Sequence, residues 1–385
     1  EVLYKPLIKI SIANNIELYS KLSYFFGILF YFGDYVTQDI KKSIYYFSIS
    51  ADCNNTAAQY YLGEIFYEGK YIEQDIKKSI HYLELSAYQQ DSDAQYLLGK
   101  IYFEGKYVKR DIQKANDYLF HSADQENLNA LYFIGKIMYE GKHILSDVIT
   151  SIQYLKRAAD MNHSDAQFLL GKIYFEGKYV KRDLEKSIKY LTLSAEQDNL
   201  DASYFIGKEF YEGKYVKSDI KISIRYLESA SNKNHSDAQY LLGLIFYNGN
   251  KIKQNIGRSI YYLKLSSDLN NPKALYLLGK IYYDGNYVSC DIKKSINYLT
   301  LAADQNYVNA QLLLGIIYSE GNVISVNIKK AIHYLELASD QENSEAQYIL
   351  GIIYYQGKHI DRDINKAIHY LHLSSFYNNS EAQYF

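Results

Sequence analysis

Apolar residues recur along the chain at the spacing of an amphipathic helix. In residues 92–105, Ala94, Leu97, Leu98, Ile101 and Tyr102 stand at positions i, i+3, i+4, i+7 and i+8. At about 100° per residue, these five side chains share one side of an α-helix. We therefore predict an α-helix that buries this stripe and ends at the glycine that follows it, since glycine readily takes the left-handed conformation that closes a helix.

A second apolar stripe follows each of these helices, as in Ile76, Ile80 and Leu83. An Asp or Asn such as Asp111 stands directly before it, and its side chain can accept hydrogen bonds from the free N–H groups of a first helical turn. We expect the second helix to end near an asparagine, which tolerates the left-handed conformation nearly as well as glycine. The asparagines at this place are Asn54, Asn162, Asn234, Asn270, Asn306 and Asn378.

The start of the first helix carries Ser or Thr followed three residues later by Gln, as in Ser92 and Gln95. This is the pattern of a capping box, in which the hydroxyl residue is the N-cap. We therefore predict that Ser92 and its equivalents are N-cap residues. The same hydroxyls complete Asn-x-Ser/Thr sequons, so helix capping explains those sequons without glycosylation.

The whole pattern repeats every 36 residues without an insertion. Residues 94–111 and 166–183, two repeats apart, are identical except at Tyr96 and Phe168. All but one of the 21 glycines fall into two columns of the repeat. Units start at residues 22, 58, 94, 130, 166, 202, 238, 274, 310 and 346, with a partial unit from 382, so the array spans 22–385. Residues 1–21 resemble a degenerate second helix, with Pro6 near its start, that could cap the array.

A single pair of helices cannot cover its own apolar side, whereas stacked pairs cover each other. The sequence therefore predicts an all-α fold, a right-handed α-solenoid of ten 36-residue helical hairpins. We expect the first glycine of each unit to allow the two helices to pack closely. These structural glycines are Gly63, Gly99, Gly135, Gly171, Gly207, Gly243, Gly279, Gly315 and Gly351.

The unit A-Q-Y-L-L-G-K-I-Y-F-E-G-K-Y-V-K-R-D-I-x-K-[SA]-x-x-Y-L resembles the Sel1-like repeat, a relative of the tetratricopeptide repeat. The match covers residues 22–385, although Tyr107, Tyr179, Tyr215 and His143 stand where the family pattern has a second loop glycine. The resemblance implies a protein-binding adaptor, as in signalling, ER-associated degradation, control of cell-wall synthesis or host–microbe contact. Its partners would be other proteins or peptides held on an extended surface.

Three positions of the first helix lie opposite the apolar stripe, namely those two, six and nine residues after the repeat alanine. In such a solenoid the first helices line the concave face, which we therefore expect to bind the partner. Aromatic rings suit recognition because they offer a large contact area at low entropic cost. The predicted partner-binding residues are Tyr60, Tyr96, Tyr132, Tyr204, Tyr240, Tyr276, Lys100, Lys136, Lys172, Lys208, Leu244, Ile316 and Ile352.

The same residues also have structural interpretations. The aromatic rows at the second and ninth positions could pack between neighbouring repeats, because they recur almost unchanged along the array. Four lysines at the sixth position each precede a glutamate by four residues, so they could form ion pairs on a solvated helix face. They are Lys100, Lys136, Lys172 and Lys208. Leu244, Ile316 and Ile352 interrupt the lysine row, and exposed apolar residues there favour a partner site or a contact between turns of the superhelix.

Composition and charge limit which classes of partner and which cellular compartments fit the sequence. The formal net charge is −2, which argues against a nucleic-acid partner. No apolar run is long enough for a membrane span. Cys53 and Cys290 are the two cysteines, too few for a disulfide framework or a zinc site. A reducing compartment, the cytoplasm, is therefore expected, with the ER lumen or secretion left open. The oligomeric state is not indicated.

No catalytic constellation or cofactor motif is present, so we predict a non-enzymatic protein without cofactor or metal. His369 and His372 are spaced i, i+3, and His333 occupies the place of His369 one repeat earlier. Exposed histidines of second helices explain this spacing better than a metal site does. The alternative function is a regulatory or targeting module of a larger enzyme or ER-associated degradation complex whose other domains lie outside this chain.

Overall fold

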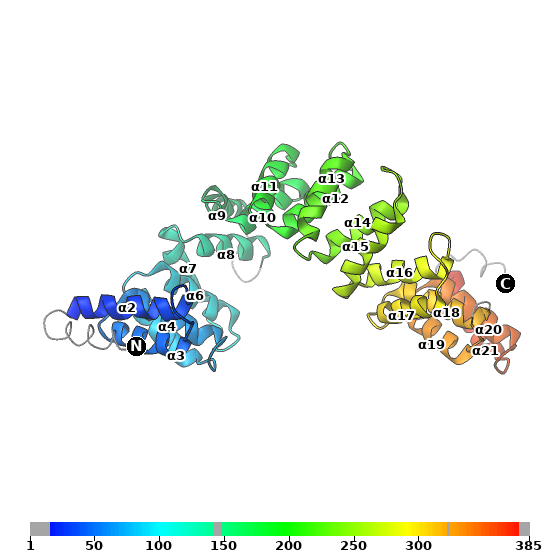
Figure 1. The fold of residues 1–385 in the computed structure, drawn as a ribbon, viewed down its shortest axis with the longest axis horizontal. Helices are drawn as coiled ribbons and strands as arrows, with labels where there is room; N and C mark the ends of the chain where they lie inside the picture. The colour runs from blue at the N-terminus through cyan, green and yellow to red at the C-terminus, as the bar shows by residue number, and fades with distance from the viewer. Residues whose placement is uncertain (1–15, 142–147, 322–323, 377–385) are drawn as a thin grey trace. The chain divides into compact units, whose positions relative to one another are not determined.

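The computed structural model describes residues 16–141, 148–321 and 324–376, and these ranges are helical throughout, with 20 helices and no strand (Figure 1). The N-terminal part of the predicted cap, the partial unit from 382 and residues such as His143 and Asn378 lie outside the described residues. The first helices of the repeats are α2 (Ile16–Phe32), α4 (Thr56–Glu68), α6 (Ser92–Glu104), α8 (Leu128–Tyr139), α10 (Ser164–Glu176), α12 (Leu200–Glu212), α14 (Ser236–Asn248), α16 (Pro272–Asp284), α18 (Val308–Glu320) and α20 (Ser344–Gln356).

The second helices alternate with the first along the chain, as the two apolar stripes predict. They are α3 (Ile40–Asp52), α5 (Ile76–Tyr88), α7 (Ile112–Asp124), α9 (Val148–Asp160), α11 (Leu184–Glu196), α13 (Ile220–Ser231), α15 (Ile256–Asp268), α17 (Ile292–Ala303), α19 (Ile328–Ser339) and α21 (Ile364–Phe376). The all-helical prediction is thus confirmed, with repeats of about 36 residues.

The chain divides into two compact units, residues 1–183 and 184–385. In the first unit α2 to α9 pair as hairpins, and each hairpin also packs against the next; α9 packs against α10. In the second unit α11 packs against α12, and α12 to α21 form hairpins in the same way. Each unit is therefore a stack in which helices contact their sequence neighbours, and several first helices, such as α2 and α4, also contact the next first helix (Figure 1).

Within a hairpin the two helices run antiparallel and approach closely at a glycine. In the pair α4/α5, the hydroxyl of Ser79 donates to the carbonyl oxygen of Gly63 at 2.7 Å. A Cβ atom on Gly63 would lie 2.5 Å from Cγ of Leu83, closer than atoms can approach. Leu83 itself is fully buried. Leu83 thus fills the space that a side chain at residue 63 would need.

This interlock of glycine and leucine recurs through both units. A Cβ on the first-column glycine would lie 2.5–2.7 Å from Cγ of the paired leucine at each of the positions that follow. They are Gly63, Gly99, Gly135, Gly207, Gly243, Gly279, Gly315 and Gly351. Gly171 is likewise buried in α10. The glycines of the second column serve a different purpose, because Gly69 and its equivalents end the first helix in the left-handed conformation, with φ of 62° at Gly69.

The predicted cap of the second helix is confirmed. The side chain of Asp111 accepts from the backbone N–H of Lys114 at 3.0 Å, and Asn255 and Asn327 do the same in their repeats. The residue that closes this helix is left-handed at the predicted asparagines that the structure describes, for example Asn54 with φ of 65°. Gln90, Glu126, Asp198 and Glu342 adopt the same conformation in the other repeats, without the help of an Asn side chain.

The predicted capping box is wrong by one residue. Ser92 is already the first residue of α6, and the N-cap is Asp91, whose side chain accepts from the N–H of Ala94 at 2.8 Å. Gln95 reaches backwards instead, because its amide donates to the carbonyl oxygen of Ala87 at the end of α5. That carbonyl also accepts from the backbone N–H of Gln90 at 2.9 Å, so Gln95 adds a second hydrogen bond at the end of α5. Gln95 therefore joins one hairpin to the next.

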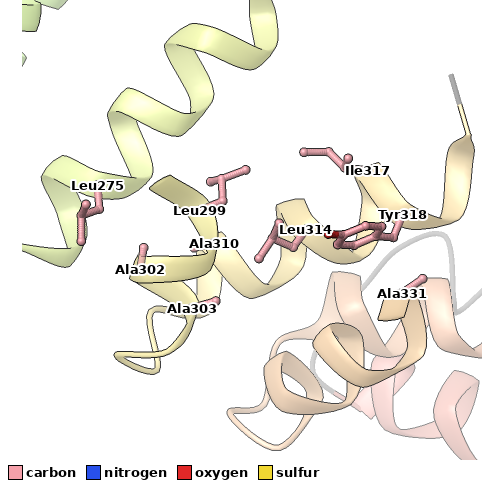
Figure 2. Close-up of a cluster of buried hydrophobic side chains, with 9 residues drawn as sticks. All are labelled: Leu275, Leu299, Ala302, Ala303, Ala310, Leu314, Ile317, Tyr318 and Ala331. Carbon is pink, nitrogen blue, oxygen red and sulfur yellow. The ribbon is translucent and has the colours of Figure 1, made fainter. Parts of the chain in front are cut away.

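The hydrophobic core is shared between repeats. Figure 2 shows Leu275 of α16 and Leu299, Ala302 and Ala303 of α17 in one cluster with Leu314 of α18. The cluster extends to Ala331 of α19, so it takes side chains from all four helices of two consecutive repeats. Apolar surface buried in this way contributes roughly 25 cal/mol per Å². No single hairpin could bury the same residues alone, as the repeat pattern predicts.

One core position holds a carboxylate where its equivalents hold isoleucine or leucine. Glu209 of α12 has an Oε2 atom that is shielded from water and makes no hydrogen bond. Burial raises the pKa of Glu209, and the nearby charge of Glu212 raises it further. The side chain at this position is Leu29 in the first repeat, and in the others it is Ile65, Ile101, Ile137, Ile173, Ile245, Ile281, Ile317 and Ile353.

We predict that Gly243→Ala lowers the free energy of unfolding by about 2 kcal/mol, because the added Cβ would lie 2.6 Å from Cγ of Leu263. The matched control is Gly257→Ala in the same repeat, where a Cβ would meet the Asn255 side chain at 3.5 Å. Removing an exposed helical glycine should leave stability unchanged or raise it. Urea unfolding of both variants measures the difference. Equal midpoints would contradict the interlock.

We predict that Glu209→Ile raises the free energy of unfolding at neutral pH by about 1–2 kcal/mol, because it removes an unpaired buried polar atom. The folded pKa of Glu209 lies above the ordinary value of 4.5, so the folded state binds the proton more tightly. The contribution of Glu209 to the free energy of unfolding is therefore most favourable below pH 4.5, and it is lost as the pH rises through the folded pKa. Urea unfolding across this pH range should show a shallower decline for Glu209→Ile than for wild type. An unchanged pH dependence would contradict the assignment.

Candidate functional site

The residues two, six and nine places after the repeat alanine form a half-buried surface on the first helices, which we call the aromatic face. In α6 these are Tyr96, Lys100 and Phe103. Tyr96 and Lys100 are half-buried, while Phe103 is 7% exposed. The aromatic face thus lies between the core and solvent. It remains accessible on the first helices because their apolar stripe packs against the second helices and the next repeat.

The second-position rings contact the residue that caps the next first helix. The ring of Tyr132 stacks on His163, with 4.7 Å between centroids, and Tyr204 stacks on His235 at 4.9 Å. Tyr276 contacts Tyr307 at 5.4 Å in the same way. Because these partners are the N-cap residues of the following repeat's first helix, the rings join repeats while each tyrosine stays half exposed. Inter-repeat packing, which the sequence left open for this row, therefore occurs.

The ninth-position rings contact the loop tyrosine of the next repeat. Tyr67 meets Tyr107 edge to face at 6.3 Å, and Tyr247 meets Tyr287 at 6.0 Å. The loop tyrosines stand where the family pattern has glycine, so this substitution gives the ninth-position rings a neighbour. Tyr67 also packs against the core cluster that contains Leu98.

The lysines of the sixth position divide between two kinds of partner. Lys208 lies 3.7 Å from Glu212, which is the predicted i, i+4 ion pair. Lys136 instead lies over the ring of Tyr132, at 5.7 Å from its centroid. Lys172 has the same relation to Phe168. These lysines are half-buried, and in the cation–π contacts the negative ring face attracts the ammonium group of Lys136 or Lys172.

Carboxylates flank the second-position tyrosines. Burial raises the pKa of Tyr132 to about 12, and the negative charges of Asp165 and Glu140 act in the same direction. At Tyr204 burial again dominates, and Asp237 and Glu212 raise the pKa further. In each pair one carboxylate follows the repeat alanine of the tyrosine's own helix by ten residues, and the other directly precedes the alanine of the following repeat. Carboxylates therefore set the electrostatic potential around these rings.

These carboxylates were not predicted from the sequence, although the helical wheel could have found them. Residues directly before the alanine and ten after it project at roughly 260° and 280°, next to the sixth position at 240°. Among the described residues of the second unit, six carboxylates of these two columns outnumber the three lysines on the same side of the first helices. The carboxylates are Asp201, Glu212, Asp237, Asp284, Glu320 and Glu345, and the lysines are Lys208, Lys273 and Lys280.

A pocket of about 300 Å³ opens on the aromatic face of the second unit. Its walls come from α16, α18 and α20, and they combine predicted residues, Tyr276 and Ile316, with residues that the repeat pattern did not assign to the site. The lining residues are Tyr276, Lys280, Tyr283, Asp284, Asn309, Leu312, Leu313, Ile316 and Glu345. Three consecutive repeats are thus needed to form it.

The other predicted site residues lie on the same face of their own helices. Tyr60 donates a hydrogen bond to Glu64 at 2.7 Å, and burial is the main cause that raises the pKa of both groups. Tyr240 and Leu244 pack against one core cluster. Ile352 is half-buried in α20. The structure brings Tyr276 and Ile316 together in one pocket.

Two observations bear on the chemistry of the chain. Within residues 16–141, 148–321 and 324–376, no three His, Cys, Asp or Glu side chains are grouped as metal ligands. In the same ranges no helix combines the length and the apolar character needed to cross a bilayer.

The chain matches the model of the Sel1 repeat ten times in succession, over residues 21–375. It is similar to the crystal structure of a protective antigen present in uropathogenic Escherichia coli strains that displays an SLR fold. The two share 25% identity with a TM-score of 0.72, over 94% of this chain and 78% of that one. It is also similar to a Sel1 repeat protein from Oxalobacter formigenes, with 26% identity and a TM-score of 0.64, over 79% and 88% of the two chains. No curated protein matches the chain.

Proposed function

The chain belongs to the Sel1 repeat family, a solenoid fold used for protein interaction, and on this premise we propose that it is a non-catalytic scaffold that binds partner proteins through the aromatic face. The observation that carries this proposal is the row of half-exposed tyrosines that recurs on consecutive first helices. Such rings present a large contact area and lose little rotamer entropy on binding.

The neighbouring repeats support this role by holding the rings in place. Tyr204 stacks on His235, the N-cap of the next repeat's first helix, so its ring orientation is fixed before a partner arrives. A preorganised side chain loses less conformational entropy on binding than a mobile one. Tyr132 on His163 and Tyr276 on Tyr307 are held in the same way. The second-position tyrosines can therefore pack between repeats and bind a partner at the same time.

The repeat also supplies surface that differs along the array. Lys208 and Lys280 stand at the sixth position of α12 and α16, whereas Leu244 and Ile316 stand there in α14 and α18. A partner that lies along the second unit would meet alternating charged and apolar residues between the rings. We propose that this alternation, rather than the tyrosines common to the repeats, selects the partner.

We predict that Tyr204→Ala weakens binding of the natural partner on the order of tenfold, because it removes a ring from the aromatic face. Tyr204→Phe keeps the ring and its stacking on His235, so it should retain most of the affinity. Arg225→Ala, on the exposed side of α13 in the same repeat, is the control on the second helix. A quantitative pull-down with the full chain, followed by titration of the captured protein, measures all three.

Thermal unfolding of each variant separates binding from folding. Tyr204→Ala also removes the contact with His235, so a modest loss of stability is expected. The binding comparison should therefore be made at a temperature where every variant is folded. Equal losses for Tyr204→Ala and Arg225→Ala would argue that the partner does not use the aromatic face.

A further inference from the structure

The pocket over α16, α18 and α20 has the chemistry of a site for one basic side chain. We propose that it binds an arginine or lysine of a basic segment in the partner protein, an inference that rests on the proposed function and adds the chemical class of the partner. Arginine and lysine carry an apolar stem and a charged head. The pocket offers apolar walls, aromatic rings and carboxylates within one volume.

The walls match the two parts of such a side chain. Leu312, Leu313 and Ile316 of α18 provide apolar surface for the stem. Asp284 of α16 and Glu345, the second residue of α20, provide negative charge for the head, and both are exposed to solvent. About 300 Å³ lies at the lower end of the volumes of ligand pockets, which suits one long side chain better than a large ligand.

The charge of the pocket favours a cation. Lys280 is the one basic residue among the lining residues, against Asp284 and Glu345, so one negative charge remains. At Tyr276 burial and Tyr307 raise the pKa, and the charges of Asp284 and Glu345 raise it further. The ring therefore lies in a negative potential, and an approaching carboxylate or phosphate would be repelled by the same two groups.

In the preceding repeat, a lysine of the chain itself occupies the position that corresponds to the proposed site for the partner's cation. There Lys273, directly before the repeat alanine of α16, lies over the ring of Tyr240 at 6.0 Å from its centroid. One repeat later the residue that corresponds to Lys273 is Asn309, and the ring that corresponds to Tyr240 is Tyr276. Both line the pocket. The partner's cation would take up the interaction that the chain itself supplies in the preceding repeat.

The test uses fluorescence anisotropy with the full chain and two short labelled peptides, one alternating arginine with glycine and the other alternating glutamate with glycine. We expect the arginine peptide to bind more tightly, with an affinity that falls as salt is added. Asp284→Asn combined with Glu345→Gln should weaken this binding about fivefold or more, since each exposed ion pair contributes modestly. Tyr276→Ala should weaken it as well, whereas Tyr276→Phe, which keeps the ring face, should not.

The control is Asp340→Asn, the same change of charge at the end of α19. Asp340 is exposed, and its charge acts on Tyr370 of the second helix α21 rather than on the pocket. If the glutamate peptide binds as tightly as the arginine peptide, or if the Asp284→Asn, Glu345→Gln variant binds like wild type, the proposal is wrong. A loss with Asp340→Asn as large as with the pocket variant would also overturn it.

The outcome is independent of the scaffold proposal, which the Tyr204 comparison decides with the natural partner. A protein that loses its partner on Tyr204→Ala but ignores the arginine peptide would retain the aromatic face as its binding surface and refute the basic-side-chain site. Circular dichroism of the pocket variants checks that each remains helical, so that a loss of binding is attributed to the pocket.

Discussion

The close approach of two helices at a glycine is the contact on which the rest of the structure depends. Where Gly63 faces Leu83, the leucine occupies the volume of the missing side chain, and the hydroxyl of Ser79 reaches the glycine carbonyl. This fixes both the separation and the register of the hairpin, because either a larger residue or a shift by one turn would bring backbone or side-chain atoms into collision. Each hairpin then offers the same outer surface to its neighbour, and stacking can repeat without adjustment.

The register of the hairpin determines which side chains remain for recognition. With the apolar stripe used inside the stack, the second-position tyrosines are left at its margin, where Tyr132 and Tyr204 rest on the caps of the following helices. Carboxylates such as Asp165 and Asp237 come to the same margin, because the residue before the repeat alanine lies beside the sixth position. The electrostatics of the surface are thus a consequence of helix geometry, with the sequence choosing Asp, Asn or Lys at each repeat.

Much of the fold could be predicted from the sequence because its determinants are local and recur in every repeat. Asp111 caps a helix as its type suggests, and Gly105 ends one in the left-handed conformation. The capping box at Ser92 failed because Asp91 caps the helix one residue earlier by accepting from the N–H of Ala94, while the Gln95 amide donates to the carbonyl of Ala87 in the previous helix. A pattern of residue types could not decide between these two hydrogen-bond arrangements, since Asp91 and Ser92 are both of a type that caps helices.

The candidate site was less accessible to sequence reasoning. The rows of Tyr276 and Ile316 follow from the helical wheel, but their meeting with Glu345 requires the spacing between three repeats. The buried carboxylate of Glu209 could not be predicted, because one exception in a column of isoleucine and leucine residues does not show whether that side chain is buried or has a hydrogen-bond partner. Local periodicity therefore specifies which side of a helix is used, whereas pockets depend on distances between helices.

The near identity of residues 94–111 and 166–183 has a genetic consequence. Homologous recombination between the two corresponding stretches of a gene could excise or duplicate two repeats at once. Because Gln95 and Gln167 make the same hydrogen bond, to Ala87 and Ala159 respectively, the new joint would regain the contact that it lost. Array length could then vary between descendants without a misfolded intermediate, and selection would act on the reach of the binding surface alone.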